Sequence, residues 1–302
     1  MSRISSDQPL VSIITPSLNQ AAFVEAAIES VLMQDYPSIE YIVVDGGSTD
    51  GTLEILKRYG DRVRWISEPD AGQSDAINKG VRLARGEIVA WLNSDDVYLP
   101  QAVSRAVREL QDHPPAALVY GQAEEIDRAG RVIGPCDYIE PFDLHRLIHC
   151  FDYIVQPATF FRREAFVDVG GLDTSLHYCM DYDLWIKLAL RYPVRYLPVM
   201  LARARLYPET KTGSGGMERL DELERMIRRY GRRRVPAFLY DEMVRTSWRY
   251  GLQALTSGNW GSAWPILQCS AFYGAALVLR KARTLIRKLR RAALRSTRSP
   301  HG

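Results

Sequence analysis

The first part of the chain alternates short apolar runs with segments in which apolar residues recur at helical spacing. The apolar runs have the length of buried strands and fall at residues 11–15, 41–45, 63–67 and 88–92. The helical spacing falls between and after them, at residues 23–33, 52–59, 75–84 and 100–110. This alternation is typical of α/β proteins, so we expect a mostly parallel sheet with helices on both faces.

The pattern is less regular in the second part of the chain. Three further short strands are predicted, at residues 118–120, 158–161 and 194–197. A helix is predicted at 181–192, and a glycine-rich loop at 213–216 precedes a region with helical character to the end of the chain. We therefore divide the chain into an α/β domain, residues 1–215, and a helical, basic C-terminal extension, residues 216–302.

Two of the predicted strands end in acidic residues. The run Ile88–Leu92 leads into Asn93-Ser94-Asp95-Asp96, and the run Tyr41–Val44 ends at Asp45. The carboxyl ends of strands are where α/β sheets bind ligands. Adjacent acids beside an amide also suit a hard divalent cation that bridges a polyphosphate. The two strand ends together predict a site for a nucleotide and a metal ion.

A simpler interpretation is that these acids cap helices. Asp96 precedes a helix predicted to begin near Pro100, and Asp50 precedes one predicted to begin near Thr52. An acidic side chain is favourable there because it accepts hydrogen bonds from the first N–H groups of the helix. The sequence leaves both interpretations open for each acid taken alone.

The charge of the chain is unevenly distributed along its 302 residues. A hydrophobic fraction of 46% and a charged fraction of 25% are ordinary for a globular protein. The net charge is +3, yet residues 280–298 contain nine basic residues and no acid, which leaves 30 basic and 36 acidic residues elsewhere. A basic tail on an acidic body indicates an anionic partner. We expect a membrane surface rather than a nucleic acid, because no aromatic-interleaved binding fold accompanies the tail.

The apolar segment before the basic tail, residues 263–279, allows three arrangements. It packs as a helical hairpin, lies in a membrane interface with the basic residues on anionic lipid, or spans a membrane. Pro265 and Gly274 interrupt the segment, and its length is at the lower limit for a span. All three arrangements stay open, and residues 262–298 are the candidate contact with an anionic membrane surface.

Cysteine usage and the N-terminus indicate a cytoplasmic location. The four cysteines are widely spaced without a Cys-x-x-Cys pair, so we expect reduced thiols. Residues 1–7 include no apolar signal region. We therefore predict a cytoplasmic protein, or one bound peripherally at the inner face of the membrane. The sequence also lacks a Gly-x-x-x-x-Gly-Lys-Ser/Thr loop and a Gly-x-Gly-x-x-Gly turn after the first strand, which excludes two other nucleotide-binding folds.

Seven short motifs follow one another in a common order. They lie at residues 11–19, 45–52, 70–80, 93–96, 156–161, 170–173 and 180–185. Together they resemble the motifs of the family 2 glycosyltransferases, which are nucleotide-sugar-dependent enzymes. The resemblance covers residues 10–212. It implies a GT-A type, Rossmann-like α/β fold, with a mostly parallel sheet flanked by helices and a C-terminal helical extension.

The resemblance assigns the nucleotide to the ends of the first two strands. Asp45 corresponds to an acid that recognises the base and ribose. Four residues at the end of the first strand are expected to line the same pocket: Thr15, Pro16, Ser17 and Asn19.

The resemblance also assigns the diphosphate and a metal ion. Asn93, Ser94 and Asp95 occupy the family's Asp-x-Asp position, and Asp95, as the acid at the third position, is the expected ligand of Mg²⁺ or Mn²⁺. The diphosphate and donor sugar are expected to contact three residues of the next motif: Asp75, Asn78 and Lys79. An alternative for Lys79 is an ion pair with Asp75, four residues earlier on a solvated helix.

Asp181 aligns with the family's catalytic base. Such a carboxylate takes the proton of the acceptor hydroxyl as its oxygen attacks the anomeric carbon. A divalent ion stabilises the leaving nucleoside diphosphate, so no second acid is required, and a single displacement inverts the anomeric configuration. Asp181 and Asp183 also suit the start of a helix, where acids are favoured by the helix dipole, and the two interpretations are compatible.

One segment departs from the family pattern. Tyr207 stands where relatives carry a metal-binding His, and a phenol with a pKa near ~10 is a poor ligand for Mg²⁺ or Mn²⁺. Two functions are therefore retained. The first is a metal-dependent, inverting glycosyltransferase that moves a sugar from a nucleotide-sugar donor to a glycan or lipid-linked acceptor in cell-surface polysaccharide biosynthesis. The alternative is a non-catalytic nucleotide-sugar or glycan-binding protein on the same fold.

Overall fold

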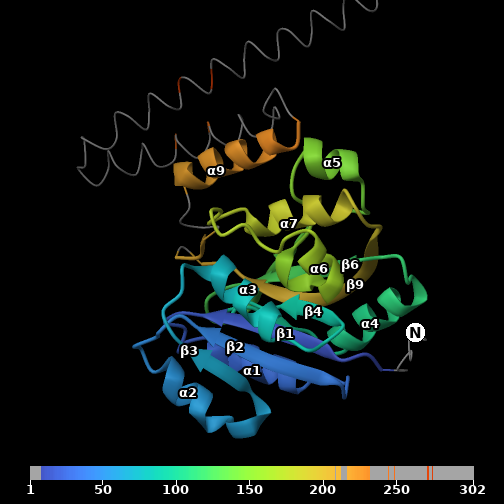
Figure 1. The fold of residues 1–302 in the computed structure, drawn as a ribbon. Coiled ribbons are helices and arrows are strands. Elements are labelled where there is room, and N and C mark those ends of the chain that lie inside the picture. Colours follow the sequence, from blue (N-terminus) through green and yellow to red (C-terminus); the bar gives the residue numbers. More distant parts are fainter. Residues whose placement is uncertain are drawn as a thin grey trace, which may run out of the picture. The chain divides into compact units, whose positions relative to one another are not determined.

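The computed structural model describes residues 8–207, 209–211 and 216–231, together with four single residues further on (Figure 1). The chain divides into two compact units between Ser214 and Gly215. In the second unit the structure describes helix α9, Gly216–Arg229, whose apolar residues recur at the spacing of one helix face. The predicted membrane-contact segment, residues 262–298, lies outside the described residues apart from Ala271 and Gly274.

The first unit is built on one nine-stranded sheet (Figure 1). The strand order is β3-β2-β1-β4-β8-β6-β9-β5, and β7 pairs with β6 outside this path. The strands are β1 Val11–Ser17, β2 Ile39–Asp45, β3 Arg64–Ser67, β4 Ile88–Trp91, β5 Val97–Tyr98, β6 Leu118–Ile126, β7 Val132–Pro135, β8 Thr159–Arg162 and β9 Val194–Arg205.

The first four strands form the parallel half of the sheet. Strands β3, β2, β1 and β4 are parallel neighbours, and Ser17 at the end of β1 lies opposite Asp45 at the end of β2. Every residue of β1 and β4 is buried, as expected for strands covered on both faces. This half matches the predicted alternation of strand and helix.

Beyond β4 the sheet is mixed. Strand β8 runs antiparallel to both β4 and β6, whereas β6 and β9 are parallel to each other. The α/β class and the flanking helices are confirmed, and the mixed direction is a feature that the hydrophobic pattern did not indicate. A short buried strand has the same apolar sequence in either direction, so its direction depends on the connections around it.

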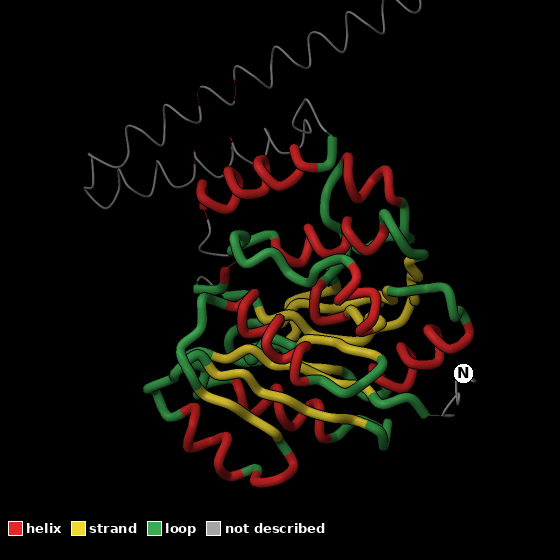
Figure 2. The backbone as a smooth tube through the Cα atoms, viewed as in Figure 1, coloured by secondary structure: helices red, strands yellow, loops and turns green. Residues whose placement is uncertain are grey.

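Helices lie on both sides of the sheet (Figure 2). The helices of the first unit are α1 Val24–Leu32, α2 Thr52–Arg58, α3 Gln73–Leu83, α4 Ala102–Asp112, α5 Leu144–His149, α6 Arg163–Asp168 and α7 Met180–Ala189, with 3₁₀ turns η1 Gly60–Arg62 and η2 Gln156–Ala158. Helix α7 is anchored in the core by Trp185, whose ring stacks on Trp91 of β4 with centroids 5.4 Å apart. Both rings are fully buried, so β4 and α7 share one part of the core.

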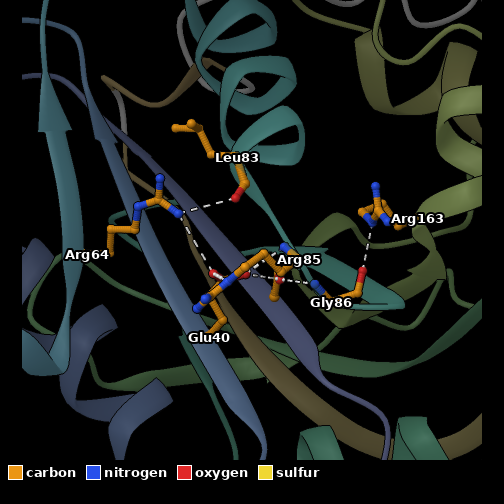
Figure 3. A network of polar contacts seen from close by, with 7 residues as sticks. Glu40, Arg64, Leu83, Arg85, Gly86 and Arg163 are labelled. Atoms are coloured by element: carbon orange, nitrogen blue, oxygen red, sulfur yellow. Dashed lines mark hydrogen bonds and ion pairs between the residues drawn. The ribbon is translucent and has the colours of Figure 1, made fainter.

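A buried carboxylate joins three segments near the amino ends of the parallel strands (Figure 3). Glu40 of β2 accepts hydrogen bonds from Ser12 Oγ at 2.6 Å and from Arg85 Nε at 2.7 Å, and Arg64 Nη1 lies 3.9 Å away. Burial alone would raise the pKa of Glu40, but the Ser12 and Arg85 hydrogen bonds outweigh burial and lower it below its ordinary value. The network fixes β1, β2 and the start of β4 against one another.

Gly86 completes the same network. Its N–H donates to Ser12 Oγ at 2.9 Å, and its carbonyl accepts a hydrogen bond from Arg163 Nε at 2.9 Å (Figure 3). A Cβ atom at this position would lie only 2.6 Å from the Ser12 backbone nitrogen. Glycine is therefore required here because the two backbones approach closely.

Candidate functional site

The carboxyl ends of β1, β2 and β4 form one edge of the sheet. The register places Ser17 beside Asp45, and Leu92, the residue after β4, donates its N–H to Ile14 of β1 at 2.9 Å. The acids that follow β2 and β4 are therefore delivered to the same edge, as expected for parallel neighbours.

Asp45 is fully buried and its carboxylate accepts four hydrogen bonds. Oδ2 accepts from the backbone N–H groups of Gly47 and Ser48, at 3.0 and 2.9 Å, and from Ser67 Oγ at 2.7 Å. Oδ1 accepts from Ser48 Oγ at 2.5 Å. These four bonds hold the turn after β2 against the end of β3. Three of the four bonds reach Oδ2 and one reaches Oδ1, so Oδ1 can accept a further hydrogen bond.

The end of β1 lies against this turn. Asn19 has a positive φ of 54°, its N–H donates to Ser48 Oγ at 2.7 Å, and its Oδ1 accepts from Thr49 N at 2.9 Å. Ser17 Oγ is buried and makes no hydrogen bond within the described residues. A buried, unpaired hydroxyl costs free energy, so it is a site at which a ligand atom is favourable.

Two other predicted pocket residues of β1 are buried. Thr15 Oγ1 and Tyr41 Oη form a hydrogen bond of 2.9 Å, and Pro16 lies opposite Val44 of β2. The Thr15 hydroxyl is thus engaged inside the sheet.

The two acids of the acidic turn, residues 93–96, have different hydrogen-bond partners. Asp96 is buried, and its carboxylate accepts from the Arg205 backbone N–H at 2.8 Å and from Asn93 Nδ2 at 3.1 Å. Burial, and then the negative charge of Asp95, raise the pKa of Asp96 well above its ordinary value. Asp96 therefore fixes the turn to the end of β9. It does not cap α4, the alternative that the sequence left open.

Asp95 is bound by Tyr207. The Tyr207 hydroxyl donates to Asp95 Oδ2 at 3.0 Å, and Arg205 Nε donates to the Asp95 carbonyl at 2.7 Å. Burial raises the pKa of Asp95, against the opposing effect of the Tyr207 hydrogen bond. Burial, and then the Asp95 charge, also raise the pKa of Tyr207, so this phenol is protonated at neutral pH and acts as a donor.

Tyr207 is held in this position by packing. Its ring lies 5.2 Å from that of Phe23, and the Arg128 guanidinium lies 5.4 Å from the Tyr207 ring centroid and 5.6 Å from that of Phe23. The sequence marks Tyr207 as a departure from the family pattern but does not indicate its contact with Asp95. The two residues lie 112 positions apart, and no local pattern links them.

The donor set of the acidic turn fits a hard divalent ion only when phosphate oxygens complete it. Within the described part of the chain, no group of three or more His, Cys, Asp or Glu residues is arranged to hold a metal. Asp95 supplies one carboxylate, with Oδ2 already bound to Tyr207. Mg²⁺ is commonly held by one or two carboxylates together with substrate phosphates and water. Asp95 therefore fits an ion that arrives with a polyphosphate.

The first turn of α3 joins the acidic turn to α7. Gln73 Nε2 donates to Asn93 Oδ1 at 2.7 Å, and Ser74 Oγ donates to Met180 Sδ at 3.0 Å. Met180 immediately precedes Asp181, which is half-buried and in the first turn of α7. Asn93 of the acidic turn and Met180 at the start of α7 thus both contact the first turn of α3.

A second connection runs along the segment after β9. Tyr207 contacts Asp95, and Lys211 Nζ donates to the His177 carbonyl at 3.0 Å, four residues before Asp181. Tyr207 therefore contacts the acidic turn, and Lys211 contacts the loop that leads into α7.

Asn93 is held on both sides. Its Nδ2 also donates to Gln156 Oε1 at 2.9 Å, and Gln156 Nε2 donates to the Trp91 carbonyl at 2.7 Å. Gln73 and Gln156 were not singled out from the sequence, although both lie within the quoted motifs. Ser94, between Asn93 and Asp95, is buried.

The three residues predicted to hold the diphosphate have different surroundings. Asn78 forms paired hydrogen bonds with the backbone of Leu172, at 2.9 and 3.0 Å, so its amide ties α3 to the loop before α7. Lys79 Nζ pairs with Glu68 at 2.7 Å, rather than with Asp75. Asp75 accepts from the Ala71 N–H at 3.2 Å.

Comparison with known proteins identifies a family for this arrangement. A family model described as glycosyl transferase family 2 matches residues 12–169. The chain is 31% identical to an uncharacterized glycosyltransferase of Rickettsia typhi over 72% of this chain and 70% of that protein. It is 33% identical to an uncharacterized glycosyltransferase of Rickettsia felis over 67% of this chain and 35% of that protein. It is 32% identical to a chondroitin synthase of Escherichia coli over 63% of this chain and 28% of that protein.

Solved structures confirm the GT-A fold. The structure of S. aureus TarS 1-349 in complex with UDP-GlcNAc matches with a TM-score of 0.58 and 19% identity, over 72% of this chain and 65% of that one. The mannosyltransferase PcManGT from Pyrobaculum calidifontis, in complex with GDP-Man and Mn²⁺, matches with a TM-score of 0.58 and 20% identity, over 93% and 81%. The chain spans about a third of the length of the Rickettsia felis relative.

Proposed function

Because the chain belongs to glycosyl transferase family 2, we propose that it transfers a sugar from a nucleotide-sugar donor to a glycan or lipid-linked acceptor, with inversion of configuration. The observation that carries this proposal is the set of hydrogen bonds that joins the acidic turn, the first turn of α3 and the start of α7. It supports one site with a phosphate-binding side at Asp95 and a proton-accepting side at Asp181.

Asp181 acts as the general base in this proposal. Its carboxylate takes the proton of the acceptor hydroxyl while the hydroxyl oxygen forms a bond to the anomeric carbon. The bond from that carbon to the diphosphate oxygen breaks at the same time, and the nucleoside diphosphate leaves. One displacement inverts the anomeric centre. Asp181 lies in the first turn of α7, where a negatively charged side chain interacts favourably with the helix dipole.

The donor is expected to occupy the carboxyl edge of the sheet. Among the described residues the Ser17 hydroxyl has no hydrogen-bond partner, and Asn19 and Asp45 hold the turn over which the nucleoside is proposed to lie. Solved relatives of the same fold hold UDP-GlcNAc and GDP-Man, which supports a uridine or guanosine diphosphate donor. Seven further residues are proposed to line this pocket: Thr15, Pro16, Asp75, Asn78, Lys79, Asn93 and Ser94.

Asp95 is the proposed ligand of Mg²⁺ or Mn²⁺. When bound, such an ion supplies positive charge to the departing diphosphate. Asn93, Gln73 and Asp96 keep the Asp95 backbone in place through the bonds described above. PcManGT, whose structure contains Mn²⁺, supports this assignment.

The place of the chain in the cell is part of the proposal. We assign catalysis to residues 1–215 and propose that residues 216–302 form a helical, basic extension of a cytoplasmic protein bound peripherally to anionic lipid. None of the helices in the described part of the chain has the length and apolar character needed to cross a bilayer. The named relatives, which include a chondroitin synthase, support a role in cell-surface polysaccharide biosynthesis.

One observation favours the alternative, a non-catalytic nucleotide-sugar or glycan-binding protein. Tyr207 occupies Asp95 Oδ2, where a metal ion would bind. A turnover assay separates the two functions. The purified chain is incubated with UDP- and GDP-sugars, Mn²⁺ and a panel of glycan acceptors, and nucleoside diphosphate release and the product's anomeric configuration are measured. An enzyme gives acceptor-dependent release and an inverted product, whereas a binding protein gives saturable binding without release.

A further inference from the structure

Lys187 joins the first turn of α7 to the loop that leads into this helix, residues 171–179. Its Nζ donates to the Gly171 carbonyl at 2.7 Å and lies 3.1 Å from Asp183 Oδ2. Gly171 begins the loop, and Asp183 lies in the first turn of α7 together with Asp181. One ammonium group therefore holds both the beginning of the loop and the turn that carries the proposed general base.

The Gly171 end of the loop is fixed by close packing. Gly171 is buried and has a positive φ of 67°, and a Cβ atom there would lie 2.8 Å from Asn78 Oδ1 and 3.0 Å from Phe166 Cε1. The same Asn78 amide pairs with the backbone of Leu172. The carbonyl that receives the Lys187 ammonium is thus held in place by α3 and α6, and it fixes the position of the ammonium in turn.

The first turn of α7 depends on contacts of this kind. The first N–H groups of a helix have no partner within the helix, so this turn is held less firmly than the helix interior. The side chain of Cys179, the residue before α7, does not cap the helix. Two side chains of the turn are anchored instead, because Met180 Sδ accepts from Ser74 Oγ at 3.0 Å and Asp183 is bound by Lys187. Asp181 lies between these two anchored residues in the sequence.

The ion pair between Asp183 and Lys187 is largely buried. Asp183 is 2% exposed, and the Lys187 side chain is 23% exposed. Taking two charges out of water costs free energy that their attraction largely offsets, so uncharged side chains of similar size often give nearly the same stability. Removing the cation alone is destabilising, because the buried carboxylate then loses its counter-charge. We therefore expect the fold to tolerate the removal of both charges together.

We propose that Lys187 is a positioning residue for the transfer reaction. By binding Gly171 and Asp183 together, it fixes the loop and the first turn of α7, and thereby the position of the Asp181 carboxylate. This inference rests on the proposed function, in which Asp181 is the general base. Reaction rates fall steeply when a reacting group is misplaced, even where the substrate is still bound. The contact made by Lys187 should therefore affect kcat and leave nucleotide affinity unchanged.

The test compares the wild type with three full-length variants. Asp183→Asn/Lys187→Met removes both charges and nearly keeps the size of each side chain. Lys187→Arg keeps a cation with several N–H donors for the same two acceptors. The matched control is Glu224→Gln/Arg228→Met, which removes an ion pair between residues four apart on α9.

Four properties of each protein are measured. They are the melting temperature, the Kd of UDP and GDP in the presence of Mn²⁺, the kcat with UDP-GlcNAc or GDP-Man and a panel of glycan acceptors, and the deuterium exchange of the amides of residues 171–181. We expect Asp183→Asn/Lys187→Met to keep its melting temperature and both Kd values, to lose at least roughly tenfold in kcat, and to exchange these amides faster. Lys187→Arg should recover most of the kcat, and the control should match the wild type.

Four results would overturn the proposal. A wild-type kcat in Asp183→Asn/Lys187→Met would remove Lys187 from positioning. Parallel losses of melting temperature, nucleotide affinity and kcat would assign Lys187 to folding alone. A lower kcat without faster exchange would place the effect of Lys187 outside the loop. These three results leave the proposed function intact, whereas the absence of turnover in the wild type would remove the proposed function and this inference together.

Discussion

Strand β2 carries a buried carboxylate near each end, and the two carboxylates have different partners. At the amino end, Glu40 is bound by Ser12 and by the charged Arg85. At the carboxyl end, Asp45 is bound by neutral donors, namely two backbone N–H groups and two serine hydroxyls. The negative charge of Glu40 is thus balanced by the positive charge of Arg85. The negative charge of Asp45 is held by neutral donors alone among the described residues.

The pKa shifts at the two edges of the sheet point in opposite directions. Hydrogen bonds outweigh burial and lower the pKa of Glu40, whereas burial and the charge of Asp95 raise that of Asp96. A raised carboxyl pKa means that folding holds an acid in an unfavourable environment. Such environments cluster at functional sites. Glu40 at the amino edge therefore contributes stability, whereas Asp96 at the carboxyl edge is held in place at a cost in stability.

The largest expected effect is the loss of catalysis in Asp181→Asn. An amide cannot accept the acceptor's proton, so kcat should fall by about 10²–10⁴. The melting temperature and UDP affinity should stay close to those of the wild type. Steady-state kinetics with matched binding titrations measure this, and Asp61→Asn controls for the charge change. Full turnover in Asp181→Asn would assign the base elsewhere.

Next in size is the effect of Glu40→Gln at the opposite edge. Removing the charge that Ser12 and Arg85 bind should lower the free energy of unfolding by about 1–3 kcal/mol, with kcat unchanged. Because folding lowers the pKa of Glu40, its contribution is present above the ordinary value of 4.5 and is lost as pH falls through the lowered value.

Urea denaturation at several pH values checks this prediction. The stability difference between the wild type and Glu40→Gln should be constant near neutrality and shrink in the acid range. A difference that grows as the pH falls would contradict the assignment of Glu40 as a charged, stabilising group.

The smallest expected effect is that of Tyr207→Phe. The ring keeps its packing on Phe23, but Asp95 Oδ2 loses its donor. If this hydrogen bond competes with the metal ion, the Mn²⁺ concentration for half-maximal activity should fall by roughly threefold. A change of that size corresponds to the net free energy of about one hydrogen bond. Tyr59→Phe, which removes a hydroxyl bound to Glu29, is the matched control. An unchanged Mn²⁺ requirement in Tyr207→Phe would show that the contact does not oppose metal binding.

The parallel half of the fold could be predicted well from the sequence, because each of its strands is marked by a run of neighbouring apolar residues. The runs at 11–15, 41–45 and 88–92 are continuous apolar segments, and the structure has them as β1, β2 and β4. The two-residue β5 is too short to have a periodicity. Strand β7 is mostly exposed, so it lacks the apolar signal on which the prediction depends.

For the candidate site, the sequence indicated the residue types but not their partners. Asn78 pairs with Leu172, 94 positions away, and Lys79 pairs with Glu68 instead of the nearer Asp75. Such pairings depend on how α3 packs against distant loops, which no spacing rule encodes.

The most direct test of the central claim, that the donor binds at the carboxyl edge, is the stabilisation by nucleotide. Melting temperatures are measured with and without saturating UDP and GDP, in the presence of Mn²⁺, for the wild type, Glu40→Gln and Asp95→Asn. A ligand at one hundred times its Kd adds about 2.7 kcal/mol to the native state. We expect the wild type and Glu40→Gln to gain the same increase in melting temperature, although Glu40→Gln starts lower, and Asp95→Asn to gain much less. A full increase in Asp95→Asn together with its loss in Glu40→Gln would place the nucleotide at the other edge and contradict the account.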